Sequence, residues 1–148
     1  MEICRELGAA AMVDVDTDDV KTRIKEITGG GANVVLDPVG GDVSELALRS
    51  TAWGGRFVVI GFASGDIPKI PLNLVLLKGT VVKGFEMRTF PQYRPDEYAA
   101  GEAKLEQMIG EGLRPVVGAV YPLDRTIEAL NAILDRKVAG KVVIDPRQ

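Results

Sequence analysis

Short apolar runs alternate with amphipathic segments along most of the chain. Two of these runs, residues 33–37 and 56–60, have apolar centres that are rich in valine, as do strands that are buried on both faces of a parallel sheet. Around them apolar residues recur at helical spacing, which predicts helices at about residues 42–51, 94–111 and 125–136. This alternation indicates an α/β fold with a mostly parallel sheet, right-handed crossovers and helices on both faces.

Further elements complete this order. Residues 2–7 resemble the last turns of a helix that Gly8 ends, and residues 11–15 are a candidate short strand. Thr17 is a candidate N-cap of a helix that ends at residues 29–31. A short segment is expected at residues 73–78, and strands at 80–85, 116–121 and 140–144. The apolar residues expected on buried helix faces are Val20, Ile24, Ile27, Leu46, Leu48, Tyr98, Leu105, Met108, Ile109, Ile127, Leu130 and Leu134.

Two of the predicted strands stop at glycine-bearing loops. One continues as Asp37-Pro38-Val39-Gly40-Gly41 and the other as Gly61-Phe62-Ala63-Ser64-Gly65. The carboxyl ends of parallel strands are where such sheets face a nucleotide. The glycine-rich phosphate loop that should open such a domain is not found ahead of them. The sequence therefore predicts one incomplete Rossmann-like nucleotide-binding domain over residues 1–148, without its first strand and phosphate loop.

Composition narrows the chemistry that these residues can perform. The 148 residues include no histidine, which removes the commonest general base and the commonest metal ligand and argues against a zinc site. The single cysteine, Cys4, cannot form an internal disulfide and fits a reducing cytoplasm. A net charge of −3, with no block of lysine or arginine, argues against a nucleic-acid surface. No apolar stretch is long enough to cross a membrane.

Several short motifs occur in a fixed order along the chain: Leu7-Gly8-Ala9, Asp37-Pro38-Val39-Gly40-Gly41, Trp53-Gly54-Gly55-Arg56, Ile60-Gly61-Phe62-Ala63-Ser64-Gly65, Ile67-Pro68 and Ala139-Gly140-Lys141-Val142-Val143. As an ordered set they resemble the medium-chain dehydrogenase/reductase superfamily. The branch they resemble is the zinc-independent NADPH:quinone oxidoreductases, or zeta-crystallin-like proteins. The resemblance covers only the carboxyl-terminal part of such proteins. It implies that the family's amino-terminal catalytic domain is absent from these residues.

The resemblance implies cofactor-binding roles for nine residues and a catalytic or metal-binding role for none. The nine are Asp37, Pro38, Val39 and Gly40 near the nicotinamide ribose; Gly61, Phe62, Ala63 and Ser64 around the nicotinamide amide and ribose; and Lys141 near the cofactor cleft. A second interpretation stays open for each group. The two turns are then ordinary loops in which proline and glycine set the backbone, and Lys141 is a solvated side chain at the start of an edge strand.

The choice between NADP and NAD rests on two positions. NADPH-using relatives place a Tyr-Arg pair where this chain has Val15 and Asp16. A carboxylate directed at the 2′-phosphate would repel it. The resemblance thus favours NADP, while Val15 and Asp16 weaken that preference; a solvated turn position for Asp16 is the alternative.

Two functions follow from these observations. In the first, the chain is the cofactor-binding portion of an NAD(P)H-dependent enzyme that transfers hydride to a quinone or enone, and the isolated chain has little or no turnover. In the second, it is a non-catalytic domain that dimerises or binds a nucleotide weakly. The resemblance also implies a homodimer formed through the edge strand from Thr80 to Phe85, because unpaired edges are an aggregation liability. The substrate cannot be named from these residues.

Overall fold

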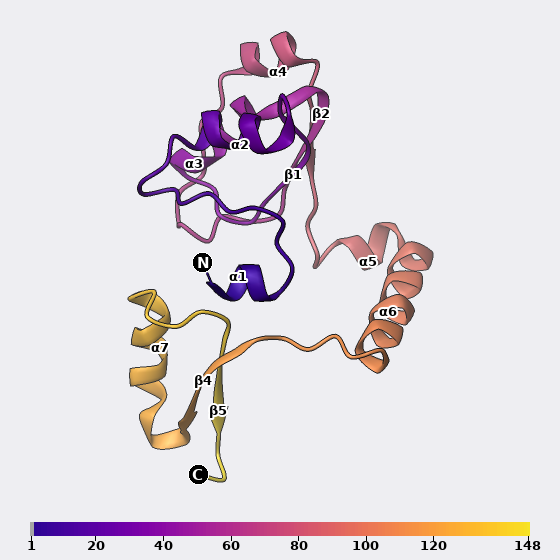
Figure 1. Ribbon diagram of the computed structural model, residues 1–148. Helices are drawn as coiled ribbons and strands as arrows, with labels where there is room; N and C mark the ends of the chain where they lie inside the picture. The colour runs from indigo at the N-terminus through magenta and orange to yellow at the C-terminus, as the bar shows by residue number, and fades with distance from the viewer. Residues whose placement is uncertain (1) are drawn as a thin grey trace. The chain divides into compact units, whose positions relative to one another are not determined.

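The computed structural model describes residues 2–148, which form two compact units that meet in sequence at Pro95 and Asp96 (Figure 1). The first unit contains α1 (Glu2–Glu6), α2 (Val20–Thr28), β1 (Ala32–Asp37), α3 (Asp42–Arg49), β2 (Thr51–Val59), α4 (Leu72–Lys78), β3 (Val81–Gly84) and α5 (Phe90–Tyr93). The second contains most of α6 (Pro95–Gly110), then β4 (Val117–Pro122), a 3₁₀ turn (Leu123–Arg125), α7 (Thr126–Leu134) and β5 (Lys141–Asp145). The prediction of a single domain over residues 1–148 stays a prediction.

The first unit is built on a three-stranded parallel sheet in the order β1-β2-β3. Phe57 on β2 is in register with Val35 on β1 and Val82 on β3. Helix α3 connects β1 to β2, and α4 connects β2 to β3. The predicted α/β fold with parallel strands is confirmed.

Three buried side chains hold the two connecting helices on this sheet. Leu48 of α3, Phe57 of β2 and Leu74 of α4 form the core cluster, and Leu48 is fully buried. Leu46, which was expected to be buried beside Leu48, is exposed. Positions 46 and 48 lie about 200° apart around a helix, so only one of them can face the sheet.

The opposite face of β1 is open in this chain. Because side chains alternate along a strand, Val35 packs against the core while Val34 and Leu36 point the other way. Leu36 is 63% exposed. Parallel sheets normally bury both faces, so the first unit leaves one apolar face of its sheet uncovered.

The second unit pairs β4 with β5 as a two-stranded parallel sheet, with α7 in the connection between them. The α7 side chains that become buried are Ala129 and Ala132. The prediction that Ile127, Leu130 and Leu134 face the core is wrong, because all three are exposed. Small alanines allow the helix to approach the strands closely, whereas two strands offer too little surface to cover the larger side chains.

Helix α6 also departs from its predicted packing. None of its residues is buried, and Leu105, Met108 and Ile109 are exposed, while Tyr98 is half-buried. The periodicity of the apolar residues therefore predicted the helix correctly, but the prediction that these residues are buried is wrong.

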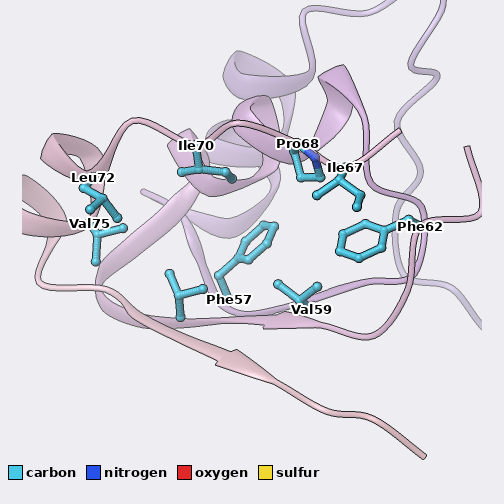
Figure 2. A pocket seen from close by; sticks show the side chains of 9 residues that line it. Phe57, Val59, Phe62, Ile67, Pro68, Ile70, Leu72 and Val75 are labelled. Atoms are coloured by element: carbon cyan, nitrogen blue, oxygen red, sulfur yellow. The ribbon is translucent and has the colours of Figure 1, made fainter. Parts of the chain in front are cut away.

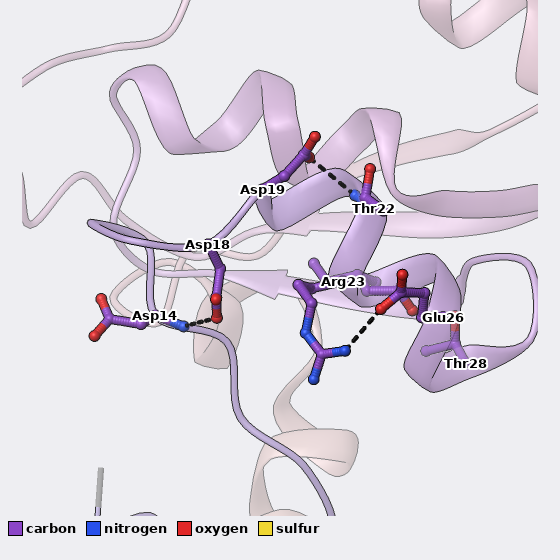
Figure 3. A network of polar contacts seen from close by, with 8 residues as sticks. Asp14, Asp18, Asp19, Thr22, Arg23, Glu26 and Thr28 are labelled. Atoms are coloured by element: carbon purple, nitrogen blue, oxygen red, sulfur yellow. Dashed lines mark hydrogen bonds and ion pairs between the residues drawn. The ribbon is translucent and has the colours of Figure 1, made fainter.

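The segment before α2 differs most from the sequence-based expectation. Residues 11–15 form no strand, and from Val15 onward the backbone turns, with aspartate side chains accepting hydrogen bonds from nearby amides. Asp18 Oδ2 accepts from the amide of Asp14 (Figure 3). Asp14 Oδ1 accepts in turn from the amide of Asp16. The N-cap of α2 is Asp19 rather than Thr17, since Asp19 Oδ1 accepts from the Thr22 amide at 3.0 Å.

The carboxyl end of α2 follows the prediction. Gly29 takes the left-handed conformation (φ 71°), and its amide donates to the Lys25 carbonyl.

Strand β2 is longer than expected, since it begins at Thr51 and includes Gly54 and Gly55. No helix of residues 2–148 is both long and apolar enough to cross a membrane.

Two buried threonines in the first unit provide a test of its packing. The Thr80 Oγ1 hydroxyl is buried without a hydrogen-bond partner, whereas that of Thr51 donates to the Ala47 carbonyl. We expect Thr80→Val to raise the free energy of unfolding by about 1 kcal/mol, because an unpaired buried hydroxyl is costly. The matched change Thr51→Val should lower it by about 1 kcal/mol, because a satisfied hydrogen bond is lost. Urea unfolding measures both, and a loss of stability in both variants would contradict the assignment.

Candidate functional site

The two glycine-bearing turns meet at the carboxyl ends of β1 and β2. Strands β1 and β2 are parallel neighbours, and Asp37 at the end of β1 is in register with Val59 at the end of β2. The turn after β1 (the first turn, residues 38–41) therefore lies against the turn after β2 (the second turn, residues 61–64). Of the nine predicted site residues, the structure brings eight together here.

Backbone hydrogen bonds fasten these turns to each other. The Ala63 amide donates to the Pro38 carbonyl at 3.0 Å, and the Ser64 amide donates to the Val39 carbonyl at 2.9 Å. In the other direction, the Gly41 amide donates to the Asp66 carbonyl at 3.0 Å. The pair of turns is thus one rigid ledge rather than two independent loops.

The Asp37 carboxylate organises the first turn from inside. It is buried, and its Oδ1 accepts from the amides of Val39 and Gly40, each at 3.0 Å. Its Oδ2 accepts from the Ser44 hydroxyl at 2.5 Å. The carboxylate thus accepts three hydrogen bonds from groups of the protein and fixes the conformation of the turn. It can contribute to cofactor binding only indirectly, by holding the turn in this conformation.

Ser44 is a residue of the site that sequence reasoning missed. It is fully buried in the first turn of α3 and ties this helix to the carboxyl end of β1. Its signal in the sequence is a hydroxyl residue seven positions after an aspartate that ends a strand. That signal is weak because serine is also common in solvated helix starts.

Gly40 makes the close approach of the two turns feasible. It has a φ of +74°, and a Cβ placed there would lie 2.7 Å from the Asp66 carbonyl oxygen and 2.8 Å from Phe62 Cδ1. The glycine therefore serves the contact between the turns, whereas the resemblance implied only a place near the nicotinamide ribose. Its role toward a cofactor stays a prediction.

One backbone donor at the ledge is free. Six of the seven amides from Ile60 to Asp66 donate to carbonyl or side-chain oxygens. The seventh, that of Phe62, has no acceptor among the residues that the structure describes. A free N–H at the carboxyl edge of a parallel sheet can donate to a ligand carbonyl. This makes the Phe62 amide the available donor of the second turn.

An apolar pocket of about 230 Å³ lies beside the second turn on the core face of the sheet, and Phe62 forms one end of it (Figure 2). Its lining is entirely apolar: Phe57, Val59, Phe62, Ile67, Pro68, Ile70, Leu72, Val75 and Val82. Such walls offer no partner to phosphates or ribose hydroxyls. The pocket is therefore not a dinucleotide site.

A second hollow borders the first turn and has a different character. Asp42, Glu45 and Asp66 line it together with Lys69. The excess of carboxylates disfavours a diphosphate on this side. A dinucleotide at the ledge would thus have to approach the free Phe62 amide without entering this hollow.

The remaining predicted positions belong to other segments of the chain. Lys141 opens β5 in the second unit and is exposed. Val15 and Asp16 are exposed in the turn that precedes α2. Asp16 contributes its amide to the Asp14 side chain, as in the solvated-turn alternative.

The chain offers no zinc site in the part that the structure describes. It contains no histidine, its one cysteine is exposed, and no three acidic or cysteine side chains of residues 2–148 are grouped around a point that could hold a metal ion. The residues present therefore do not fit a zinc ion, and no step of the chemistry is assigned to one.

Comparison with known proteins gives the site a context. Residues 1–104 match the model of the zinc-binding dehydrogenase family. A quinone oxidoreductase-like protein 2 homolog of Nematostella vectensis is 38% identical over 99% of this chain and 41% of its own length. The mouse quinone oxidoreductase-like protein 2 is 37% identical over 93% of this chain and 40% of its own length. The chain thus spans about two fifths of the curated relatives it matches.

Solved structures agree with this result. A mycobacterial protein in complex with NADPH is 26% identical, with a TM-score of 0.85 over 98% of this chain and 45% of that protein. An NAD-dependent alcohol dehydrogenase is 30% identical, with a TM-score of 0.78 over 97% of this chain and 40% of that protein. Their folds are the Rossmann-like nucleotide-binding fold of medium-chain dehydrogenases.

The fit between the two turns can be tested with two glycines. We expect Gly40→Ala to lower the free energy of unfolding by about 2 kcal/mol more than Gly65→Ala. Both positions have positive φ, but a Cβ at Gly65 meets no atom within 4 Å. The difference therefore isolates the contact between the turns. Equal losses in thermal unfolding experiments would show that the turns do not depend on this contact.

Proposed function

Because the chain belongs to the zinc-binding dehydrogenase family, within the medium-chain dehydrogenase/reductase superfamily, we propose that it is the cofactor-binding portion of an NAD(P)H-dependent quinone oxidoreductase-like enzyme. The observation that carries this proposal is the rigid ledge of two turns at the carboxyl ends of parallel strands, with one free amide on it. The curated relatives named quinone oxidoreductase-like support a quinone or enone as hydride acceptor.

The proposed roles are those of positioning. Hydride transfer is the chemistry of the nicotinamide itself, which the protein must hold and orient. The Phe62 amide is assigned to the nicotinamide carboxamide, and the backbone of Gly61, Ala63 and Ser64 to the surrounding wall. Asp37 keeps Pro38, Val39 and Gly40 in place. Lys141 is retained as a candidate cofactor contact, and no residue of this chain is assigned a catalytic role.

The cofactor is a nicotinamide dinucleotide, and both NADP and NAD are candidates. One structural relative holds NADPH and another is NAD-dependent. Val15 and Asp16 offer no cation to a 2′-phosphate, which weakens the preference for NADP. A cytoplasmic location fits the single unpaired Cys4.

Binding can be measured directly on the ¹⁵N-labelled chain. We expect NADPH or NADH to shift the Phe62 amide resonance most strongly, followed by those of Gly61 and Ser64, because the only free amide of the second turn is there. Adenosine 2′,5′-bisphosphate, which lacks the nicotinamide, should leave Phe62 unchanged. Trp53 is a poor reporter, since it is 82% exposed near the opposite end of β2.

The alternative function has its own outcome in this experiment. If millimolar NADPH and NADH leave the second turn unshifted while the chain stays folded, cofactor binding by these residues is refuted. The chain would then be a non-catalytic dimerisation or weak nucleotide-binding module.

We further propose a homodimer through β3. This strand is at one edge of the sheet, and all four of its residues are exposed. The Phe85 amide donates to Val59 of β2, so by the alternation of a strand the Val82 amide points to the open edge. A second copy could pair there, which would cover an otherwise unprotected edge.

A proline at this edge tests the dimer. We expect Val82→Pro to raise the dimer dissociation constant by about tenfold or more, because it removes an edge donor without breaking the ladder to β2. Val82→Ala, which keeps the amide, is the matched control. Sedimentation at micromolar concentration measures both variants. A monomeric parent chain, or equal behaviour of the two variants, would contradict pairing through β3.

A further inference from the structure

The apolar pocket beside the second turn is enclosed by several segments of the first unit. Phe57 and Val59 of β2 form one side of it, and Ile67 and Ile70, from the loop that leads to α4, lie across from them (Figure 2). Side chains of α4 close the end opposite Phe62. Because Phe57 is 1% exposed and belongs to the core cluster, the pocket reaches down to the core of this unit.

Two prolines stiffen the loop that covers the pocket. Pro68 and Pro71 fix the backbone angle φ at two positions of residues 65–71 and remove two amide donors. Pro71 is also the N-cap of α4, with a φ of −66° and an extended conformation. The restricted loop holds a space of about 230 Å³ open between itself and β2.

The charged residues of this loop border a different hollow. Asp66 and Lys69 line the hollow beside the first turn, and neither of them lines the apolar pocket. All 9 side chains that line the apolar pocket are hydrocarbon. A polar ligand group in this pocket would therefore give up its hydrogen bonds to water without replacement, whereas an apolar group has none to lose.

The volume and the walls together define the group that fits. A cavity of about 150 Å³ lined by leucine, isoleucine and phenylalanine can hold benzene, so this larger space has room for one ring with short alkyl substituents. Phe57 and Phe62 border it and offer ring faces and edges, with which aromatic groups pair favourably. We propose that the pocket is a binding site for a small, uncharged aromatic hydrocarbon group.

This inference goes beyond the cofactor proposal and does not rest on it. The apolar walls do not suit a dinucleotide, and binding to the pocket is measured with no nicotinamide present. The two proposals share only Phe62, whose side chain lines the pocket and whose amide belongs to the ledge. Methyl groups of other wall residues are therefore the reporters, so that either proposal can fail while the other stands.

The test uses p-xylene as the probe and methyl NMR spectra of the ¹³C-labelled full chain. We expect p-xylene to shift the methyl resonances of Val59, Ile70 and Val75 with a dissociation constant of roughly 1 mM or lower. p-Toluate, in which a carboxylate replaces one methyl group, should bind at least about tenfold more weakly. Unshifted wall methyls, or equal affinity for p-toluate, would overturn the proposal. So would equal shifts at exposed Ile127 of α7, which would show unspecific association.

Two aspartate variants test the location. Leu72 is the first residue of α4 and lines the pocket, so Leu72→Asp places a carboxylate at the wall, in a helix turn that favours negative charge. Asn73→Asp adds the same charge to the next residue, which does not line the pocket. We expect p-xylene to bind at least about tenfold more weakly to Leu72→Asp and within about twofold of the parent chain to Asn73→Asp.

Equal affinities of the two variants would refute the assignment to this pocket. If Leu72→Asp does not fold, Ile67→Asp takes its place, because Ile67 lines the same pocket from a loop position that is 72% exposed.

Discussion

The structure of the first unit depends on the parallel pairing of β1 with β2. Because Asp37 and Val59 end their strands in register, the two turns leave the sheet at the same level and are close enough to exchange backbone hydrogen bonds. The buried Asp37 carboxylate then draws in the amides of the first turn and the hydroxyl of Ser44. Without that register the ledge would be two separate mobile loops, and its one free amide would have no defined direction.

The same pairing determines which surfaces the chain leaves open. The connections through α3 and α4 cover one face of the sheet with Leu48, Phe57 and Leu74, and the alternation of side chains leaves Val34 and Leu36 on the other. In the second unit, close packing of Ala129 and Ala132 turns the larger side chains of α7 outward. Each unit thus leaves apolar side chains uncovered within the described residues.

Much of the fold was accessible from the sequence. The runs at residues 33–37 and 56–60 and the glycine at Gly29 are local signals: they predicted β1, the second half of β2 and the end of α2. The strand expected at residues 11–15 failed because its apolar positions are interleaved with aspartates that bind neighbouring amides. The prediction that the apolar residues of α6 and α7 are buried was wrong for a different reason. Periodicity shows that a helix has an apolar face, but it does not show whether another element packs against that face.

For the site, the order of motifs alone identified the two turns, because strand, turn and glycine are properties of neighbouring residues. It could not show that Gly40 serves the contact with Phe62 and Asp66, that Ser44 completes the partners of Asp37, or that Phe62 has the free amide. Nor could it show that the Lys78 ammonium, at the end of α4, donates to the Thr51 carbonyl at the start of β2. These facts were decided only by the tertiary structure, because they depend on hydrogen bonds, close contacts and charges between residues that are distant in the chain.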